Sequence, residues 1–219
     1  MPSRKFCLEL NGRKLLNAQH FLKSLSSIEE YLKNKIIYAR IFSHIFMPSE
    51  KEKIPLSQVK KLPYRSLNRM LKKMREYLKQ NEVVQRMFEE YGVDIEEIDF
   101  IPMMFGNLDV SAKTDHGVII FNYRLLCDGD FFKDFSYGTH EITHWLQQCT
   151  GKKATKSSDD GEYLHNPYEQ EGFQNQIEYI AEQFGEGEAE EYVDDLLEHH
   201  EVKDKKEQDE LQAILLEKV

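Results

Sequence analysis

The 219-residue chain is 40% hydrophobic and 31% charged, which excludes a wholly disordered protein and allows one sizeable core or two small domains. No apolar run near the start could serve as a signal peptide, and no later run reaches the ~18 apolar residues of a membrane-spanning helix. We therefore expect a soluble, cytoplasmic protein with no membrane partner. The formal charge of −10 is unevenly spread, because residues 1–79 hold 18 Lys/Arg and 6 Asp/Glu whereas residues 80–219 hold 11 and 33.

The first 92 residues are expected to form a basic, helical N-terminal region. Apolar residues recur at helical spacing over 14–46, and again on one face of an amphipathic helix over 66–80. A further short helix is predicted over 83–91, where Gly92 would end it.

The segment from Lys51 to Lys79 contains 10 Lys/Arg but only two acidic residues. Such a run could bind nucleic acid or an acidic protein. It carries no nucleic-acid motif and no regular interleaving of aromatic residues, so the solvated side of an amphipathic helix is the favoured interpretation. A nucleic-acid partner stays possible but is not favoured.

The sequence pattern changes in the middle of the chain and indicates an α+β fold. Short apolar runs bounded by Gly, Pro, Asn and Asp predict strands at 98–105 and 117–122. A helix is predicted over 134–150 with Gly151 as its C-terminal cap, and Pro167 can start another that runs to Phe184. Residues 93–185 would thus form one unit, made of a short sheet and two helices.

The last segment, residues 186–219, is expected to be an acidic helical tail. Gly185 and Gly187 would separate it from the preceding helix, and its own helix is predicted over roughly 188–217. Its acidic run is typical of a solvated helix face.

The central predicted helix contains His140-Glu141-Ile142-Thr143-His144, a His-Glu-x-x-His motif. The i, i+4 spacing puts both imidazoles on one helix face, where they can share one Zn²⁺. Glu141 would lie beside them as a general base. An apolar stripe is predicted on another side of this helix: Ile142, Trp145, Leu146 and Cys149. The three cysteines form no Cys-x-x-Cys pair, so a thiolate zinc site is not indicated.

The third ligand is expected on the following helix. Its sequence offers two carboxylates, Glu169 and Glu171, either of which could complete a His₂Glu site with one position open for water. Glu171 is favoured, and the alternatives are Glu169, His165 or no third protein ligand. Asn175, one turn beyond Glu171, is suitably placed to orient a ligand histidine.

These motifs resemble those of the zincin metallopeptidases of the gluzincin type. Glu171-Gly172-Phe173 is similar to the Glu-Gly-Phe that carries the glutamate ligand in M1-type aminopeptidases. It is also similar to the Glu-Ala element of thermolysin-like enzymes, with Asn175 at the position of an Asp. Pro167 to Gly172 resembles the Glu-x-Glu-Ala element of small intracellular zincins, including ImmA/IrrE-like and phage proteases. The resemblance covers roughly residues 98–185, and Gly172 stands where those enzymes usually carry Ala.

The resemblance implies a zincin-like fold, a zinc cofactor and hydrolysis of a peptide or protein substrate. It implies that residues 117–122 form the edge strand above the cleft, although a run of this kind is also typical of a buried strand. It further implies an oxyanion-stabilising residue near the second helix, for which four candidates exist: Tyr163, His165, Tyr168 and Tyr179. Two other functions stay open, namely a metal-binding regulatory module of this fold with little activity and a nucleic-acid-associated protein.

Overall fold

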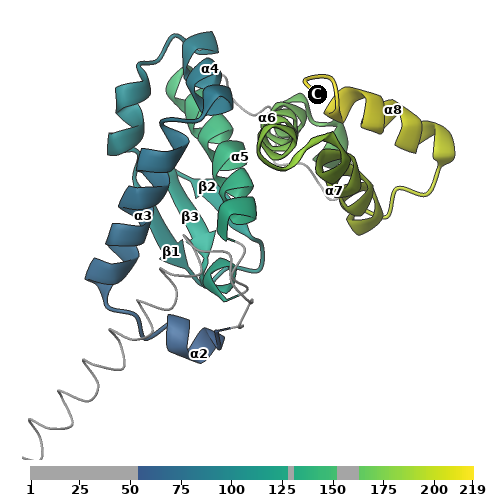
Figure 1. Cartoon of the computed structure of the whole chain (residues 1–219). Helices are drawn as coiled ribbons and strands as arrows, with labels where there is room; N and C mark the ends of the chain where they lie inside the picture. Colours follow the sequence, from purple (N-terminus) through teal and green to yellow (C-terminus); the bar gives the residue numbers. More distant parts are fainter. Residues whose placement is uncertain (1–53, 128–130, 152–162) are drawn as a thin grey trace, which may run out of the picture.

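Figure 1 shows the computed structural model of the chain, which describes residues 54–127, 131–151 and 163–219. The helix predicted over 14–46 lies outside the described residues. The elements in chain order are α2 (Leu56–Val59), α3 (Tyr64–Leu78), α4 (Glu82–Glu90), η1 (Ile95–Phe100), β1 (Met103–Gly106), β2 (Ala112–Asp115), β3 (Val118–Asn122), η2 (Tyr123–Leu126), α5 (Phe131–Cys149), η3 (Tyr163–His165), α6 (Pro167–Phe184), α7 (Glu186–His199) and α8 (Lys205–Leu215). The α+β class expected from the sequence is confirmed.

The two helices predicted within 66–91 exist as α3 and α4. α3 buries the apolar stripe that its spacing predicts: Leu67, Met70, Leu71, Met74 and Leu78. Asn81 begins α4, because its side-chain oxygen accepts a hydrogen bond from the Val84 N–H at 3.1 Å. Gly92 follows α4 with a φ of 65°, a value that favours glycine.

The strand predicted at 98–105 is only partly correct. Its first half belongs to η1, and the strand β1 begins at Met103. Ile95, Ile98 and Ile101 recur every three residues, which is the period of a 3-10 helix, and the latter two are fully buried. The Asp94 side chain accepts a hydrogen bond from the Glu96 N–H and starts this turn.

The sheet has three strands in the order β1-β3-β2, with β1 parallel and β2 antiparallel to β3. β3 is therefore the central strand, and the edge-strand role expected for 117–122 is wrong, whereas the expectation of a buried strand is confirmed. β2 was not predicted. It joins β3 through His116 and Gly117, whose φ values of 50° and 76° are those of a tight hairpin turn.

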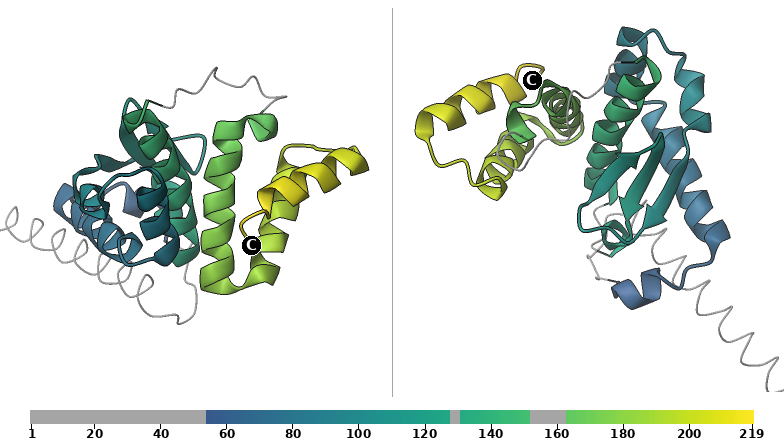
Figure 2. Two further views of the ribbon diagram at one scale, coloured as in Figure 1. Left: turned by 90° about the horizontal axis from the view of Figure 1, so that it is seen from above. Right: turned by 180° about the vertical axis from the view of Figure 1, so that it is seen from behind.

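One face of the sheet is covered by α3 and α5 (Figure 2). Met103, Phe105, Ile119 and Phe121 point to this face and are buried, in agreement with the period-2 pattern of strands. The sheet thus fixes one side of α5.

The other side of α5 packs against α6, and α6 in turn contacts α7 and α8 (Figure 1). α6 begins and ends where the sequence predicts, with the Asn166 side chain capping its first turn and Gly185 at a φ of 101° after it. The acidic tail consists of two helices rather than one, because Asp204 caps the start of α8. α5 is consequently held between the sheet and a helical layer.

The buried apolar residues form one continuous cluster from Ile54 in the α2 region to Leu215 in α8. α3 and α4, which belong to the predicted N-terminal region, pack on β1, α5 and α6. The division into 1–92, 93–185 and 186–219 stays a prediction. The interface between α5 and α6 lies in the middle of this body, and the motif residues lie there.

Candidate metal centre

The motif histidines lie on the face of α5 that meets α6. His140 is buried, and His144 is half-buried. On another side of the helix, Ile142 and Leu146 are fully buried as predicted. The predicted apolar stripe ends there, because Trp145 is only half-buried and Cys149 is exposed.

Three side-chain atoms converge at the interface of α5 and α6. The Nε2 atoms of His140 and His144 are 3.0 Å apart, and Glu169 Oε2 lies 3.4 Å from the first and 3.2 Å from the second. Bonds of about 2.0–2.1 Å to a tetrahedral ion would set such donor atoms about 3.3–3.4 Å apart. The buried His-His-Glu group can therefore bind a metal ion.

The structure brings Glu169, and not the favoured Glu171, to the two histidines. Residues two apart on an α-helix point about 200° apart, so only one of these carboxylates can face the histidines. Glu171 instead accepts hydrogen bonds from Tyr91 Oη at 2.6 Å and from Gln147 Nε2 at 3.0 Å. The geometry thus corrects the choice between the two glutamates.

The two other predicted neighbours of the site have different contacts. His165 is exposed and lies 2.8 Å from Glu207 of α8, away from the two histidines. Asn175 is buried, but it donates to Thr143 Oγ1 at 2.9 Å and accepts from Lys218 Nζ at 2.7 Å. Asn175 therefore joins α5, α6 and the last residues of the chain instead of orienting a ligand histidine.

Gln147 lies within hydrogen-bond distance of a ligand histidine. Its Oε1 lies 2.9 Å from His144 Nδ1, and its Nε2 donates to the Tyr168 carbonyl at 3.2 Å as well as to Glu171. Sequence reasoning missed it, although the signal was present. Positions 140, 144 and 147 share one helix face by the i, i+4, i+7 rule.

His140 is packed so closely that α6 needs a glycine opposite it. A Cβ at Gly172 would lie 2.9 Å from His140 Cε1 and 3.0 Å from Nδ1. The ring of Phe173 meets the imidazole edge-on at a centroid distance of 4.6 Å. Among the described residues, the buried His140 Nδ1 has no hydrogen-bond partner, whereas Nε2 faces the other two ligands.

Charge and burial act in opposite directions on the group. Burial lowers the pKa of His144, but the hydrogen bond and charge of Glu169 outweigh it and raise the value to about 9. Burial likewise raises the pKa of Glu169, whereas its bonds to the two histidines bring it well below its usual range. Without an ion, a proton on His144 Nε2 therefore balances the Glu169 charge.

Glu141, the predicted general base, is buried beside this group. Its Oε2 accepts a hydrogen bond from Thr114 Oγ1 at 2.7 Å, and its charge contributes to the raised pKa of His144. Thr114 belongs to β2, the edge strand that packs on α5. Nothing local in the sequence indicated Thr114, because this contact depends on a polar strand that was not predicted.

The four candidates for the oxyanion-stabilising residue lie in different parts of the structure. Tyr163 lies near the group, because its ring contacts that of Phe173 at a centroid distance of 5.9 Å. Burial, followed by the charges of Glu169 and Glu141, raises its pKa. Tyr179 is instead buried near Tyr77. Its pKa is raised first by burial and second by the charge of Tyr77. Tyr168 offers its carbonyl to Gln147, as described above.

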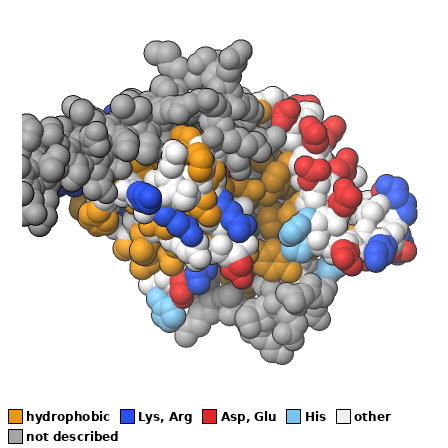
Figure 3. Space-filling view, turned by 90° about the horizontal axis from the view of Figure 1, so that it is seen from below, with side chains coloured by type: hydrophobic (Ala, Val, Ile, Leu, Met, Phe, Trp, Pro, Cys, Tyr) orange, Lys and Arg blue, Asp and Glu red, His pale blue; other side chains and the backbone are white. Residues whose placement is uncertain are grey.

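The basic residues of 51–79 are partly neutralised within the described chain. Lys79 lies 2.6 Å from Glu96 and 2.9 Å from Asp99, and Arg75 donates to the Ile101 carbonyl. Acidic side chains gather over the C-terminal helices (Figure 3). The two interpretations of this segment, a solvated helix face and a binding surface, both stay predictions.

No protein-family model matches the chain, and searches of curated proteins and of solved structures found no match. The resemblance to zincins thus stays a prediction from the motif residues. None of the helices in the described ranges combines the length and the apolar character required to span a bilayer.

Proposed function

We propose that the chain is a zinc-dependent peptidase in which His140, His144 and Glu169 hold the ion and Glu141 is the general base. The observation that carries the proposal is the triangle of donor atoms, with edges of 3.0, 3.2 and 3.4 Å, next to a buried glutamate. Two imidazoles and one carboxylate are a donor set typical of catalytic zinc, which keeps a position for water or substrate.

The surroundings of the three ligands suit an ion that solvent must reach. The side chains of His144 and Glu169 keep 16% and 18% of their surface exposed, whereas that of His140 keeps 7%. One side of the group is therefore accessible and the other is closed. When bound, Zn²⁺ lowers the pKa of a coordinated water to about 7 and polarises the scissile carbonyl.

Glu141 would move the protons of the reaction. Its carboxylate would take a proton from the attacking water and pass it to the leaving amine. Thr114 holds one carboxylate oxygen at 2.7 Å, which fixes the side chain and leaves its other oxygen for that proton. An extended substrate could pair with β2, because within the described residues this strand pairs with β3 alone.

The test uses the purified full chain and a matched variant, Glu141→Gln. We expect about one zinc per chain in both proteins, because glutamine keeps the size of the side chain and none of the three ligands changes. A mixed peptide library, read by mass spectrometry, should show cleavage by the wild type and a loss of about 10²–10⁴-fold in the variant.

Two outcomes would contradict the proposal. Equal cleavage by both proteins would mean that Glu141 is not the base. Stoichiometric zinc in the wild type without cleavage of any peptide would instead identify a metal-binding module without turnover.

A further inference from the structure

A series of hydrogen bonds connects the end of α4 with the ring of His144. Tyr91 Oη, at the end of α4, donates to Glu171 Oε1 at 2.6 Å. Gln147 Nε2, on α5, donates to Glu171 Oε2 at 3.0 Å. The other end of the same amide, Gln147 Oε1, lies 2.9 Å from His144 Nδ1. Glu171, whose carboxylate does not face the three converging donor atoms, is thus connected to His144 through Gln147.

The donor and the acceptor of each hydrogen bond in this series follow from the chemical groups involved. A carboxylate only accepts hydrogen bonds, and so does the Tyr168 carbonyl, which lies 3.2 Å from Gln147 Nε2. Both acceptors require the amide nitrogen of Gln147 to point towards them. Its oxygen must then point to His144 Nδ1, and this contact is favourable only if Nδ1 carries a proton.

A proton on Nδ1 decides what the other ring nitrogen can do. In the neutral ring the lone pair is then on Nε2, the atom that lies 3.0 Å from His140 Nε2 and 3.2 Å from Glu169 Oε2. A metal ion needs this lone pair. The opposite tautomer would direct a hydrogen atom at the place where the three donors converge.

We infer that Glu171 is a positioning residue that fixes, through Gln147, the tautomer of His144 that can bind the ion. The inference rests on the proposed metal centre but concerns a residue that would not touch the ion. The Tyr91 hydroxyl remains a donor, because burial and then the hydrogen bond to Glu171 raise the pKa of Tyr91.

Glu171→Gln tests this role with almost no change of shape, because it removes the carboxylate and leaves Gln147 Nε2 only the Tyr168 carbonyl, at the longer distance of 3.2 Å, as a fixed acceptor. An amide at this position can donate as well as accept, so Gln147 could rotate and turn its N–H towards His144. We expect zinc affinity, measured by competition with a chelator, to fall by about 10–100-fold, as for the loss of other partners of metal-bound histidines. Gln147→Met should cause a similar loss, whereas the exposed neighbour Gln148 offers the matched control Gln148→Met with unchanged affinity.

An exchange of the two side chains separates this role from simple packing. Gln147→Glu alone would set two carboxylates against each other and should weaken zinc binding. The double variant Gln147→Glu/Glu171→Gln keeps an acceptor for His144 Nδ1, removes the repulsion between the two carboxylates and keeps the net charge. It loses only the hydrogen bond to the Tyr168 carbonyl. We expect it to recover zinc affinity to within about 3-fold of the wild type, which is a free-energy difference of about 0.6 kcal/mol.

The proton on Nδ1 can itself be observed. In the zinc-loaded wild type, ¹H–¹⁵N spectra should show a slowly exchanging proton on His144 Nδ1, held by Gln147 Oε1, and Glu171→Gln should make this proton exchange faster. Nδ1 without a proton in the wild type, or a double variant no better than the single ones, would overturn the inference. Cleavage that fails while the tautomer and zinc affinity behave as stated would reject only the proposed function.

Discussion

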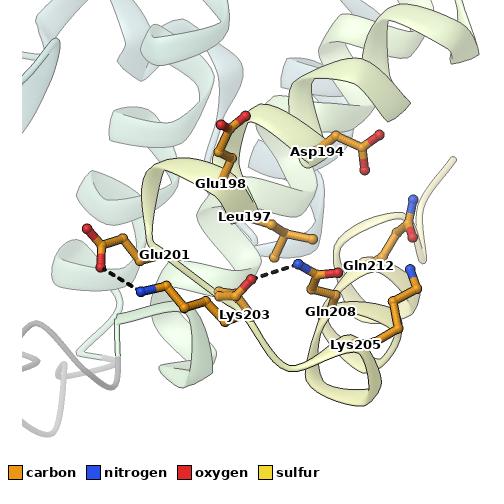
Figure 4. A pocket seen from close by; sticks show the side chains of 9 residues that line it. Asp194, Leu197, Glu198, Glu201, Lys203, Lys205, Gln208 and Gln212 are labelled. Carbon is orange, nitrogen blue, oxygen red and sulfur yellow. Dashed lines mark hydrogen bonds and ion pairs between the residues drawn. The ribbon is translucent and has the colours of Figure 1, made fainter.

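Charged side chains are exposed in the hollow between α7 and α8 but are removed from water at the interface of α5 and α6. The hollow has a volume of about 540 Å³, and charged side chains of both helices line it (Figure 4). Glu201 and Lys203 pair there at 3.6 Å with about four fifths of each side chain exposed. At the interface of α5 and α6, in contrast, His140 and Glu141 are buried and Glu169 is half-buried.

The difference between the two regions is therefore the exposure of their charged side chains. Charges that stay in water interact weakly and cost little to place. Charges removed from water must be matched by partners at defined positions, so their arrangement reflects a specific ligand or proton. Each of the following predictions tests that contrast.

The largest effect is expected from Glu169→Gln. The change removes one of three ligands and the charge that holds the proton on His144. Zinc affinity should fall by more than about 100-fold, beyond the ~10–100-fold expected of an outer partner such as Glu171. Chelator competition measures both variants side by side. If Glu171→Gln weakened binding more than Glu169→Gln, the assignment of the third ligand would be reversed.

The sequence was sufficient to predict the two helices that build this site. Local signals mark their ends, namely Gly151 after α5 and Pro167 at the start of α6. The His140 and His144 pair follows from helical spacing alone. Each of these features depends on residues within a few positions of one another.

Features that depend on contacts distant in sequence could not be predicted. The choice between Glu169 and Glu171 depends on how α6 is rotated against α5, and both residues lie in its first two turns. β2 has no alternating apolar residues, so only its pairing with β3 makes it a strand. Thr114 and the central position of β3 were missed for this reason.

The next largest effect is a pH dependence of zinc binding. In the metal-free protein the pKa of His144 is about 9, above its ordinary value of 6.5, so zinc must displace a proton at neutral pH. Affinity should rise about tenfold per pH unit between pH 7 and 9 and level off above. Titrations at several pH values measure the slope. His165→Gln, which changes an exposed histidine outside the group, should keep it.

The same shift predicts the stability of the metal-free chain. A raised pKa stabilises the fold fully below pH 6.5, and this contribution is lost as the pH rises through 9. The loss should approach about 3 kcal/mol, since each pKa unit corresponds to about 1.4 kcal/mol. Urea unfolding at pH 6 and pH 10 checks the sign. Greater stability at pH 10 in the wild type would contradict the raised pKa.

A smaller effect distinguishes two glycines, one in each region. Gly172→Ala would place a Cβ 2.9 Å from His140 Cε1, whereas nothing lies within 4 Å of a Cβ at Gly187 in α7. We expect the first change to destabilise the metal-free protein by about 1–3 kcal/mol and to weaken zinc binding by displacing His140. Gly187→Ala should be neutral or stabilise by up to about 1 kcal/mol. Equal effects of both changes in thermal unfolding would show that His140 can move aside freely.

The smallest effect is expected from Glu198→Gln in the hollow, the same chemical change as Glu169→Gln. Glu198 is exposed on α7, one turn after Asp194, so its removal relieves a like-charge pair in water. Stability should change by less than about 0.5 kcal/mol, and zinc affinity should not change. Because both variants lose one carboxylate of identical size, the ratio of their zinc affinities measures what position alone contributes. A loss of zinc affinity in Glu198→Gln would mean that the hollow and the metal centre are coupled, and the contrast between them would no longer hold.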